Sequence, residues 1–436
     1  MIRKIVAALL CIALLALCGC TKKEPATVDE MIPLAQTVCD YLQKNDPSAA
    51  FANSTVSLQY SMQEESFVSM WDSALKTCGP IVSTVGVLQT RWDSAQRCVV
   101  DYAFDCERIG LVVRFYFNEY AEMIGVTTYS KDLYDQPAPP KGVTEEAFEI
   151  TTEEGVVLHG VICWPEQAKD GAVPAALLLP GAGAVGMDCA YGKVTFLRDM
   201  AYGLAEKGIA SLRMNKVSYE TSEISSLVFS IDMEYIKPYT QAYALLTQDS
   251  RVDASRVYLL GHDLGATVAP RLDQTLDSAG LILLSATARP LYQLHYDQNQ
   301  QFLSMHPELD YRAQITQQLA NAEKIMSKSS AFEAQSETAF GYNGYYYWEM
   351  GQNTPDLSLV TKPVFLGHGL EDFQTYDADW TSLTQGFANA SVTAKQYDGL
   401  SHLFTPSLGT QETTEYFEKA SVDQTVIDDV AAFILQ

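Results

Sequence analysis

The sequence has 436 residues, of which 47% are hydrophobic and 19% charged, and its formal net charge is -25 at pH 7. A chain this acidic repels phosphate backbones and anionic lipid headgroups, so we expect neither nucleic-acid binding nor electrostatic attachment to a membrane. The apolar content suffices for substantial cores, and the length corresponds to two or three domains of roughly 100–200 residues each.

Residues 1–20 have the pattern of an export signal. A basic start precedes an apolar run from Ile5 to Leu17 that is too short to span a membrane comfortably. The run ends in Leu17-Cys18-Gly19-Cys20, which resembles the bacterial lipobox and implies that Cys20 is lipidated and becomes the mature N-terminus. Because Cys18 is unusual at its position, a plain secretory signal stays open. Both alternatives place the protein outside the cytoplasm, and the first anchors it to the bacterial membrane through lipid alone.

Six cysteines follow Cys20, and an even number in an exported chain permits disulfides. Cys98 and Cys106 are spaced to close a small hairpin, and Cys39 and Cys78 are spaced to meet between helices. The cysteines fit the role of small buried hydrophobes equally well. Neither a Cys-x-x-Cys nor a His-x-x-x-His spacing occurs, so we expect no metal site and no cofactor.

Residues 28–134 predict a small α+β domain. Segments 28–44 and 66–77 carry apolar residues at helical spacing. Strand patterns then occupy residues 83–92, 97–106, 109–116 and 122–128. Helices followed by an antiparallel sheet are typical of such a domain. No polar side chains converge in it, so we expect a spacer or a binding module.

A proline-rich linker at residues 135–146 precedes a second domain at 147–436, since clustered prolines make an extended and semi-rigid segment. Strand and helix patterns alternate in this domain. We expect strands at residues 147–152, 156–164, 175–179, 209–213, 257–260, 280–285, 363–367 and 392–397, and helices at 194–207, 232–248 and 422–435. The alternation predicts an α/β fold, with a doubly wound, mostly parallel sheet and an active site at the carboxyl ends of its strands.

The alternation stops between residues 286 and 361. Segments 293–304, 311–327 and 331–347 are typical of helices, and an insertion of this size is too long for a bare loop. We therefore expect a helical cap that covers a small-molecule substrate. Five aromatic residues are candidates to line its pocket, although packing of the cap onto the sheet explains most of them better: Tyr342, Tyr345, Tyr346, Tyr347 and Trp348.

Residues 257–268 indicate a strand that turns sharply into a helix. An apolar strand pattern is followed by Gly261-His262-Asp263-Leu264-Gly265 and then by a helix-compatible run. This is the pattern of a nucleophile elbow, whose glycines let the strand and the helix approach closely. The exposed position that usually carries serine carries Asp263.

Across residues 147–436 the order of these features resembles the α/β-hydrolase superfamily, and in particular the secreted lipoprotein esterases of the serine-aminopeptidase and dienelactone-hydrolase neighbourhood. Segments 177–183, 208–213 and 397–404 carry this resemblance together with the elbow. Residues 28–134 resemble the small accessory domain that precedes the hydrolase domain in some bacterial lipoproteins. The resemblance implies a nucleophile, an acid and a histidine in that chain order.

Asp263 holds the nucleophile position in this order. Asp372 follows the strand at 363–367 and is the candidate acid, with Glu371 as the weaker choice. His402 lies in a loop after the last parallel strand and is the candidate base. Two other histidines are expected to orient neighbouring loops, His262 and His368, and no role is expected for the remaining three, His159, His295 and His306.

The resemblance also implies an oxyanion hole formed by the backbone N–H groups of Ala182 and Leu264. Ala182 lies in a glycine-rich turn after the strand at 175–179, and Leu264 directly follows the nucleophile position. No lysine follows the turn at Walker spacing, so a nucleotide site is not expected there.

Aspartate at the elbow changes the chemistry. Its carboxyl group, with an ordinary pKa of about 4, is ionised near neutral pH and attacks without help from a base. Attack on an ester carbonyl yields an anhydride, whereas attack on saturated carbon yields an ordinary ester that His402 and water can hydrolyse. Epoxide hydrolases and haloalkane dehalogenases have a similar Gly-His-Asp elbow. Leu264, however, stands where dehalogenases carry a halide-binding tryptophan, and the turn lacks their His-Gly preface.

Three hypotheses stay open. The first is an exported hydrolase of the esterase-like lineage that acts on a small ester or related substrate with Asp263 as nucleophile. The second is an epoxide or haloalkane hydrolase in which Asp263 attacks carbon. The third is a ligand-binding protein that has lost catalysis together with its serine.

Overall fold

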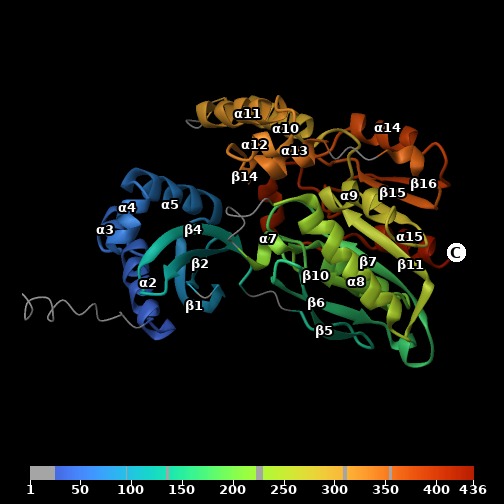
Figure 1. Ribbon diagram of the computed structural model, residues 1–436, viewed down its shortest axis with the longest axis horizontal. Helices are drawn as coiled ribbons and strands as arrows, with labels where there is room; N and C mark the ends of the chain where they lie inside the picture. The colour runs from blue at the N-terminus through green and yellow to red at the C-terminus, as the bar shows by residue number, and fades with distance from the viewer. Residues whose placement is uncertain (1–24, 95, 134–136, 222–228, 308–311, 353–355) are drawn as a thin grey trace, which may run out of the picture. The chain divides into compact units, whose positions relative to one another are not determined.

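A computed structural model describes residues 25–94, 96–133, 137–221, 229–307, 312–352 and 356–436. The chain divides into two compact units, residues 1–133 and 134–436 (Figure 1). The predicted signal peptide and Cys20 lie outside the described residues. Within the described ranges, no helix has the length and apolar composition that a membrane crossing requires.

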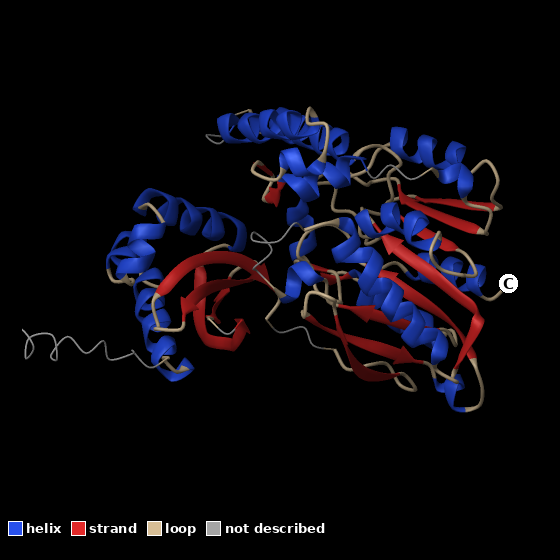
Figure 2. Ribbon diagram, viewed as in Figure 1, coloured by secondary structure: helices blue, strands red, loops and turns tan. Residues whose placement is uncertain are grey.

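In the first unit, helices pack on a four-stranded antiparallel sheet of order β1-β2-β3-β4 (Figure 2). The backbone N–H of Thr27 donates to Glu30 Oε2 over 2.8 Å and starts the first helix, and Gly79, at φ +84°, ends the last one. Two six-residue helices are absent from the sequence prediction because they are too short to show a period. The elements are α2 (Val28–Leu42), α3 (Pro47–Ala52), α4 (Val56–Ser61), α5 (Glu64–Cys78), β1 (Ile81–Ser94), β2 (Arg97–Cys106), β3 (Gly110–Asn118) and β4 (Met123–Lys131).

The six cysteines of the described residues are all buried, and none forms a disulfide with another. The two disulfides considered from the sequence are therefore not formed, and the cysteines act as small apolar side chains. Burial raises the pKa of Cys78 to about 12 and that of Cys106 to about 11. Both thiols are consequently protonated near neutral pH.

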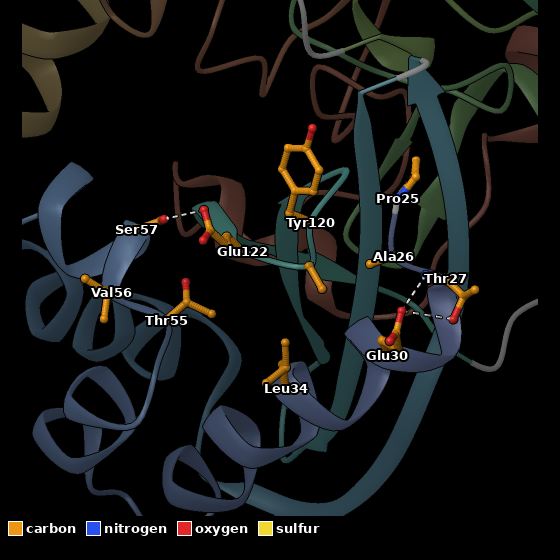
Figure 3. Close-up of a pocket in the computed structure, with 11 residues that line it drawn as sticks. Pro25, Ala26, Thr27, Glu30, Leu34, Thr55, Val56, Ser57, Tyr120 and Glu122 are labelled. Atoms are coloured by element: carbon orange, nitrogen blue, oxygen red, sulfur yellow. Dashed lines mark hydrogen bonds between the residues drawn. The ribbon is translucent and has the colours of Figure 1, made fainter. Parts of the chain in front are cut away.

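A surface pocket of about 950 Å³ belongs to the first unit (Figure 3). Its two carboxylates already have partners in the same unit. Ser57 Oγ donates to Glu122 Oε2 over 2.9 Å, and Glu30 accepts the hydrogen bond from Thr27 that starts α2. These contacts fix helices and a turn, and we assign no chemistry to the pocket.

The second unit is built on an eight-stranded sheet of order β16-β15-β12-β11-β7-β10-β6-β5. Strand β6 is antiparallel to both of its neighbours. The remaining strands of this sheet, which are β10, β7, β11, β12, β15 and β16 in spatial order, run parallel to one another. Strand β5 begins at Thr144, inside the predicted linker. The prediction missed this start because the charged residues at the beginning of the strand lack the apolar alternation of a strand. The strands are β5 (Thr144–Thr151), β6 (Val157–Trp164), β7 (Val173–Leu179), β10 (Ala210–Met214), β11 (Val252–His262), β12 (Leu281–Leu284), β15 (Val364–Gly369) and β16 (Val392–Tyr397).

Helices cover both faces of this sheet and enclose one apolar core on each side. Helices α8 and α9 pack on one face (Figure 1), and α6 and α15 pack on the other. All seven residues of β7 are buried, as expected for a central parallel strand. The helices outside the cap are α6 (Phe196–Glu206), α7 (Val217–Glu220), the π-helix η3 (Asp232–Ile236), α8 (Lys237–Gln248), α9 (Leu264–Asp273), α14 (Asp377–Gly386) and α15 (Gln424–Ile434).

The predicted cap is a group of helices between β12 and β15, to one side of the sheet (Figure 1). The prediction of one continuous helix over 331–347 is wrong. Phe340 and Gly341 have φ of +51° and +79°, which a right-handed helix cannot accommodate, and they form the turn of a hairpin. The cap comprises α10 (Leu291–Met305), α11 (Arg312–Met326), α12 (Ala331–Ala334), β13 (Thr338–Ala339), β14 (Tyr342–Asn343) and α13 (Gly344–Gln352).

Candidate active site

Asp263 lies at the tip of the sharp turn between β11 and α9, with φ of +53° and ψ of -121°. A side chain on Gly265 would place its Cβ 2.4 Å from the carbonyl oxygen of Leu179, and one on Gly261 would meet Ala266 N at 2.5 Å. Glycine is therefore required on both sides of the turn. A non-glycine residue at positive φ costs about 1–3 kcal/mol, which the surrounding structure must offset. Such strain is a frequent property of functional sites.

The carboxylate of Asp263 accepts a hydrogen bond from the backbone N–H of Ala182, with 2.8 Å between N and Oδ2. Ala182 lies in the turn that follows β7, the parallel neighbour of β11. Leu264 is the first residue of α9, so its N–H is among those that have no acceptor within the helix. The two groups predicted to form an oxyanion hole thus flank Asp263, at a helix end whose dipole favours negative charge.

Asp372 and His402 lie in the loops after β15 and β16 and are joined by a hydrogen bond of 2.8 Å between Oδ2 and Nδ1. The Asp372 carboxylate also accepts bonds from Gln374 N, Thr375 N and Thr375 Oγ1. Burial opposes ionisation of Asp372, but the interaction with His402 and the other hydrogen bonds outweigh it and lower its pKa to about 2. Glu371, the weaker candidate acid, is exposed.

The hydrogen bond between Asp372 and His402 also changes the pKa of His402. Burial alone would lower its pKa, yet the charge and hydrogen bond of Asp372, together with the charge of Asp263, raise it above the ordinary value. Because Asp372 engages Nδ1, the other ring nitrogen, Nε2, is left for a water molecule or a substrate. Among the described residues, no hydrogen bond joins His402 to Asp263.

His262 and Ser285 hold the backbone of His402 in place. The carbonyl oxygen of His402 accepts from His262 Nε2 over 3.0 Å and from Ser285 Oγ over 2.9 Å. The His262 ring also packs on Phe196, with 4.2 Å between ring centroids. His368 stacks on Trp380 beside Asp372. Both histidines contact the loops that they were expected to orient.

The cap contributes a histidine for which the sequence suggested no role. Burial lowers the pKa of His295 to about 4, while the charge of Asp263 opposes this shift. Its ring stacks on Tyr342, and its Nδ1 lies 3.2 Å from the hydroxyl of Tyr347. No local pattern singles out His295, because only the packing of α10 against β14 and α13 brings it to the site.

The five cap aromatics named from the sequence do not act alike. Burial, together with the charge of Asp263, raises the pKa of Tyr342 to about 12. Tyr346 and Tyr347 are buried in the core of the second unit. Trp348 donates from Nε1 to the carbonyl oxygen of Lys328 within the cap. Packing therefore accounts for Tyr346, Tyr347 and Trp348, Tyr345 is only partly buried, and Tyr342 borders the site.

The chain is similar to several esterases. No family model matches the chain. Esterase EstD of Thermotoga maritima is 28% identical over 305 residues, which cover 68% of this chain and 70% of that protein. Two solved esterases are similar in structure. Est1E from Butyrivibrio proteoclasticus is 14% identical, with a TM-score of 0.43 and coverage of 66% of this chain and 97% of its own. A Pyrococcus furiosus esterase is 15% identical, with a TM-score of 0.42 and coverage of 60% and 84%.

The eight-stranded sheet, the strained elbow and the similarity to an esterase define the second unit as an α/β-hydrolase domain. The similarity to Esterase EstD supports an esterase-like hydrolase, preceded by a small domain with an antiparallel sheet.

Proposed function

We propose that the second unit hydrolyses a small molecule through a covalent ester on Asp263, formed by attack on a saturated carbon that bears a leaving group. The hydrogen bond of 2.8 Å from Ala182 N to Asp263 Oδ2 carries this proposal. It makes the two carboxylate oxygens inequivalent. Oδ2 engages Ala182, one of the two donors of the predicted oxyanion hole, and Oδ1 is the oxygen that remains for attack.

In the first step Oδ1 forms a bond to carbon, and the leaving group departs with the electron pair of the broken bond. In the second step Nε2 of His402 removes a proton from water, and the resulting hydroxide adds to Cγ of Asp263. Negative charge then develops on Oδ2, where Ala182 N–H already points. Collapse of this intermediate releases the alcohol and restores the carboxylate, and Asp372 stabilises the protonated His402 meanwhile.

Ester hydrolysis is the second candidate, and the similarity to Esterase EstD favours it. In that reaction the carbonyl oxygen of the substrate needs the predicted oxyanion hole, one donor of which, Ala182 N–H, is already bonded to Asp263 Oδ2. Attack by Asp263 would also produce an anhydride. The geometry therefore favours saturated carbon over a carbonyl, and a ligand-binding protein without turnover is the third alternative.

The test is turnover in heavy-oxygen water with panels of epoxides, haloalkanes and short esters. Because water attacks Cγ, we expect ¹⁸O to enter the Asp263 carboxylate after several turnovers, as read by mass spectrometry of the peptide. Label in the product alone would contradict the covalent step. Absence of turnover on every panel would overturn catalysis and favour the binding protein.

We also propose that the protein is exported and held at the bacterial membrane by lipid on Cys20. Its small-molecule substrate would then lie outside the cytoplasm. The basic start, the apolar run and the cysteine motif support this proposal. Metabolic labelling with a radioactive fatty acid should mark the wild type and leave Cys20→Ala unlabelled. Equal labelling of both would contradict lipidation at this residue.

A further inference from the structure

A fully buried lysine lies beneath the oxyanion turn. Lys216 follows β10 by two residues, at the carboxyl edge of the strand next to β7, and its side chain is 1% exposed. Burying an ammonium group is expensive unless several partners compensate it. The partners of Lys216 therefore indicate what the charge does.

Two of these partners are carbonyl oxygens of the turn. Lys216 Nζ lies 3.0 Å from Gly181 O and 2.8 Å from Gly183 O. The oxygen of Gly181 belongs to the same peptide unit as the N–H of Ala182. Because a trans peptide directs its C=O and N–H in opposite directions, Lys216 and Asp263 lie at opposite ends of one peptide dipole.

The π-helix η3 supplies the remaining partners. Glu234 Oε1 lies 3.2 Å from Lys216 Nζ, and its side chain is also 1% exposed. The hydroxyl of Tyr235 accepts from Lys216 at 2.9 Å and lies 2.9 Å from Gly181 O, to which it donates. Short π-helical segments are frequent at functional sites, and this one directs two consecutive side chains at the same lysine.

We propose that Lys216 is a positioning residue for the oxyanion hole. Its charge, neutralised by Glu234, holds the Gly181–Ala182 peptide so that the Ala182 N–H points at Asp263, and it polarises that N–H into a stronger donor. Hydrogen bonds arranged in a chain strengthen one another, and a positive charge at the oxygen end of a peptide acts in the same sense. The inference rests on the proposed function, because a strong donor matters when charge develops on Asp263 Oδ2.

A lysine that only stabilised the fold would not act selectively on the Ala182 amide. Lys362 provides the control. Its Nζ lies 2.9 Å from Oδ1 of Asp273, the last residue of α9, and Lys362 itself precedes β15, at the end of the sheet opposite the oxyanion turn. Lys362→Met thus removes a partly exposed lysine–aspartate pair from the same domain without touching the oxyanion turn.

The experiment compares full-length Lys216→Met, Tyr235→Phe and Lys362→Met with the wild type. The first readout is the Ala182 amide in spectra of protein labelled with ¹⁵N-alanine, assigned by its loss in Ala182→Gly. In Lys216→Met we expect an upfield proton shift and hydrogen exchange at least about tenfold faster, because the donor is less polarised and less fixed. Tyr235→Phe, which keeps the ring in the core, should give a smaller change of the same sign.

The second readout is steady-state kinetics. In Lys216→Met we expect kcat to fall roughly 10- to 100-fold with KM nearly unchanged, since removal of a whole oxyanion donor costs about 10²–10³-fold. If Lys216→Met does not fold, Tyr235→Phe and the double variant Lys216→Met/Glu234→Gln, which leaves no unpaired charge, provide the test.

The two proposals fail in different ways. If the wild type turns over no substrate, the proposed function fails while the Ala182 amide still tests the role of Lys216. If the wild type is active and Lys216→Met matches Lys362→Met in amide shift, exchange rate and kcat, the positioning role is overturned and the proposed function stands.

Discussion

The backbone N–H of Ala182 donates to Oδ2 of Asp263 across 2.8 Å, so an oxygen of the protein already engages one of the two predicted oxyanion donors. A serine at the same position would leave the hole free for the carbonyl oxygen of a substrate. Our proposal that Asp263 attacks saturated carbon rests on this contact.

We expect Asp263→Ser to acquire activity on short p-nitrophenyl esters, while the wild type stays at background. The serine empties the oxyanion hole, and His402, already paired with Asp372, can serve as its base. Release of p-nitrophenolate measures the effect, with Asp263→Ala as the control. A folded serine variant no faster than the alanine variant would argue against an esterase ancestry of the site.

Replacement of His402 by alanine should leave the first step intact and stop the second. A covalent ester then accumulates on Asp263, because no base activates water. Intact-protein mass spectrometry after incubation with an active substrate should show a mass increase. The increase should be absent from the double variant Asp263→Asn/His402→Ala. An unchanged mass together with an unchanged rate would remove His402 from the mechanism.

Hydrolytic activity should rise with increasing pH, and the midpoint of this rise should lie above pH 6.5. His402 acts as a base only when neutral, and Asp372 and Asp263 raise its pKa above that value. Activity should therefore rise as the pH increases through this pKa. In Asp372→Asn the neighbouring charge is lost, so the rise should move to lower pH while kcat drops by about 10³–10⁴. A rise that stays in place would show that another group titrates.

The elbow should not tolerate a side chain at position 265. The Cβ of an alanine there would lie 2.4 Å from Leu179 O and 2.5 Å from Pro180 O, both rigid backbone atoms. We expect Gly265→Ala to lower the free energy of unfolding by about 2–4 kcal/mol. Urea denaturation measures it. Gly171→Ala is the control, since nothing lies within 4 Å of its added Cβ, and its change should stay within about 0.5 kcal/mol.

The linear pattern of residues was sufficient for the fold class. Strand and helix periods are local properties of the sequence. They were therefore enough to predict the alternating elements of the second unit and the elbow around Asp263. Chain order also selected Asp372 and His402 out of many acidic residues and six histidines, and the structure joins these two by a hydrogen bond.

The contacts that decide the chemistry belong to residues far apart in the chain, and no local pattern records them. Residues 182 and 263 meet only because β7 and β11 are parallel neighbours, and Lys216 reaches the same turn from β10. The cap places His295 beside the site in the same way. The sequence by itself thus determined a hydrolase scaffold with an aspartate at its elbow. Tertiary packing decided that one oxygen of this aspartate accepts the N–H of Ala182, because hydrogen-bond geometry depends on how the strand ends are brought together.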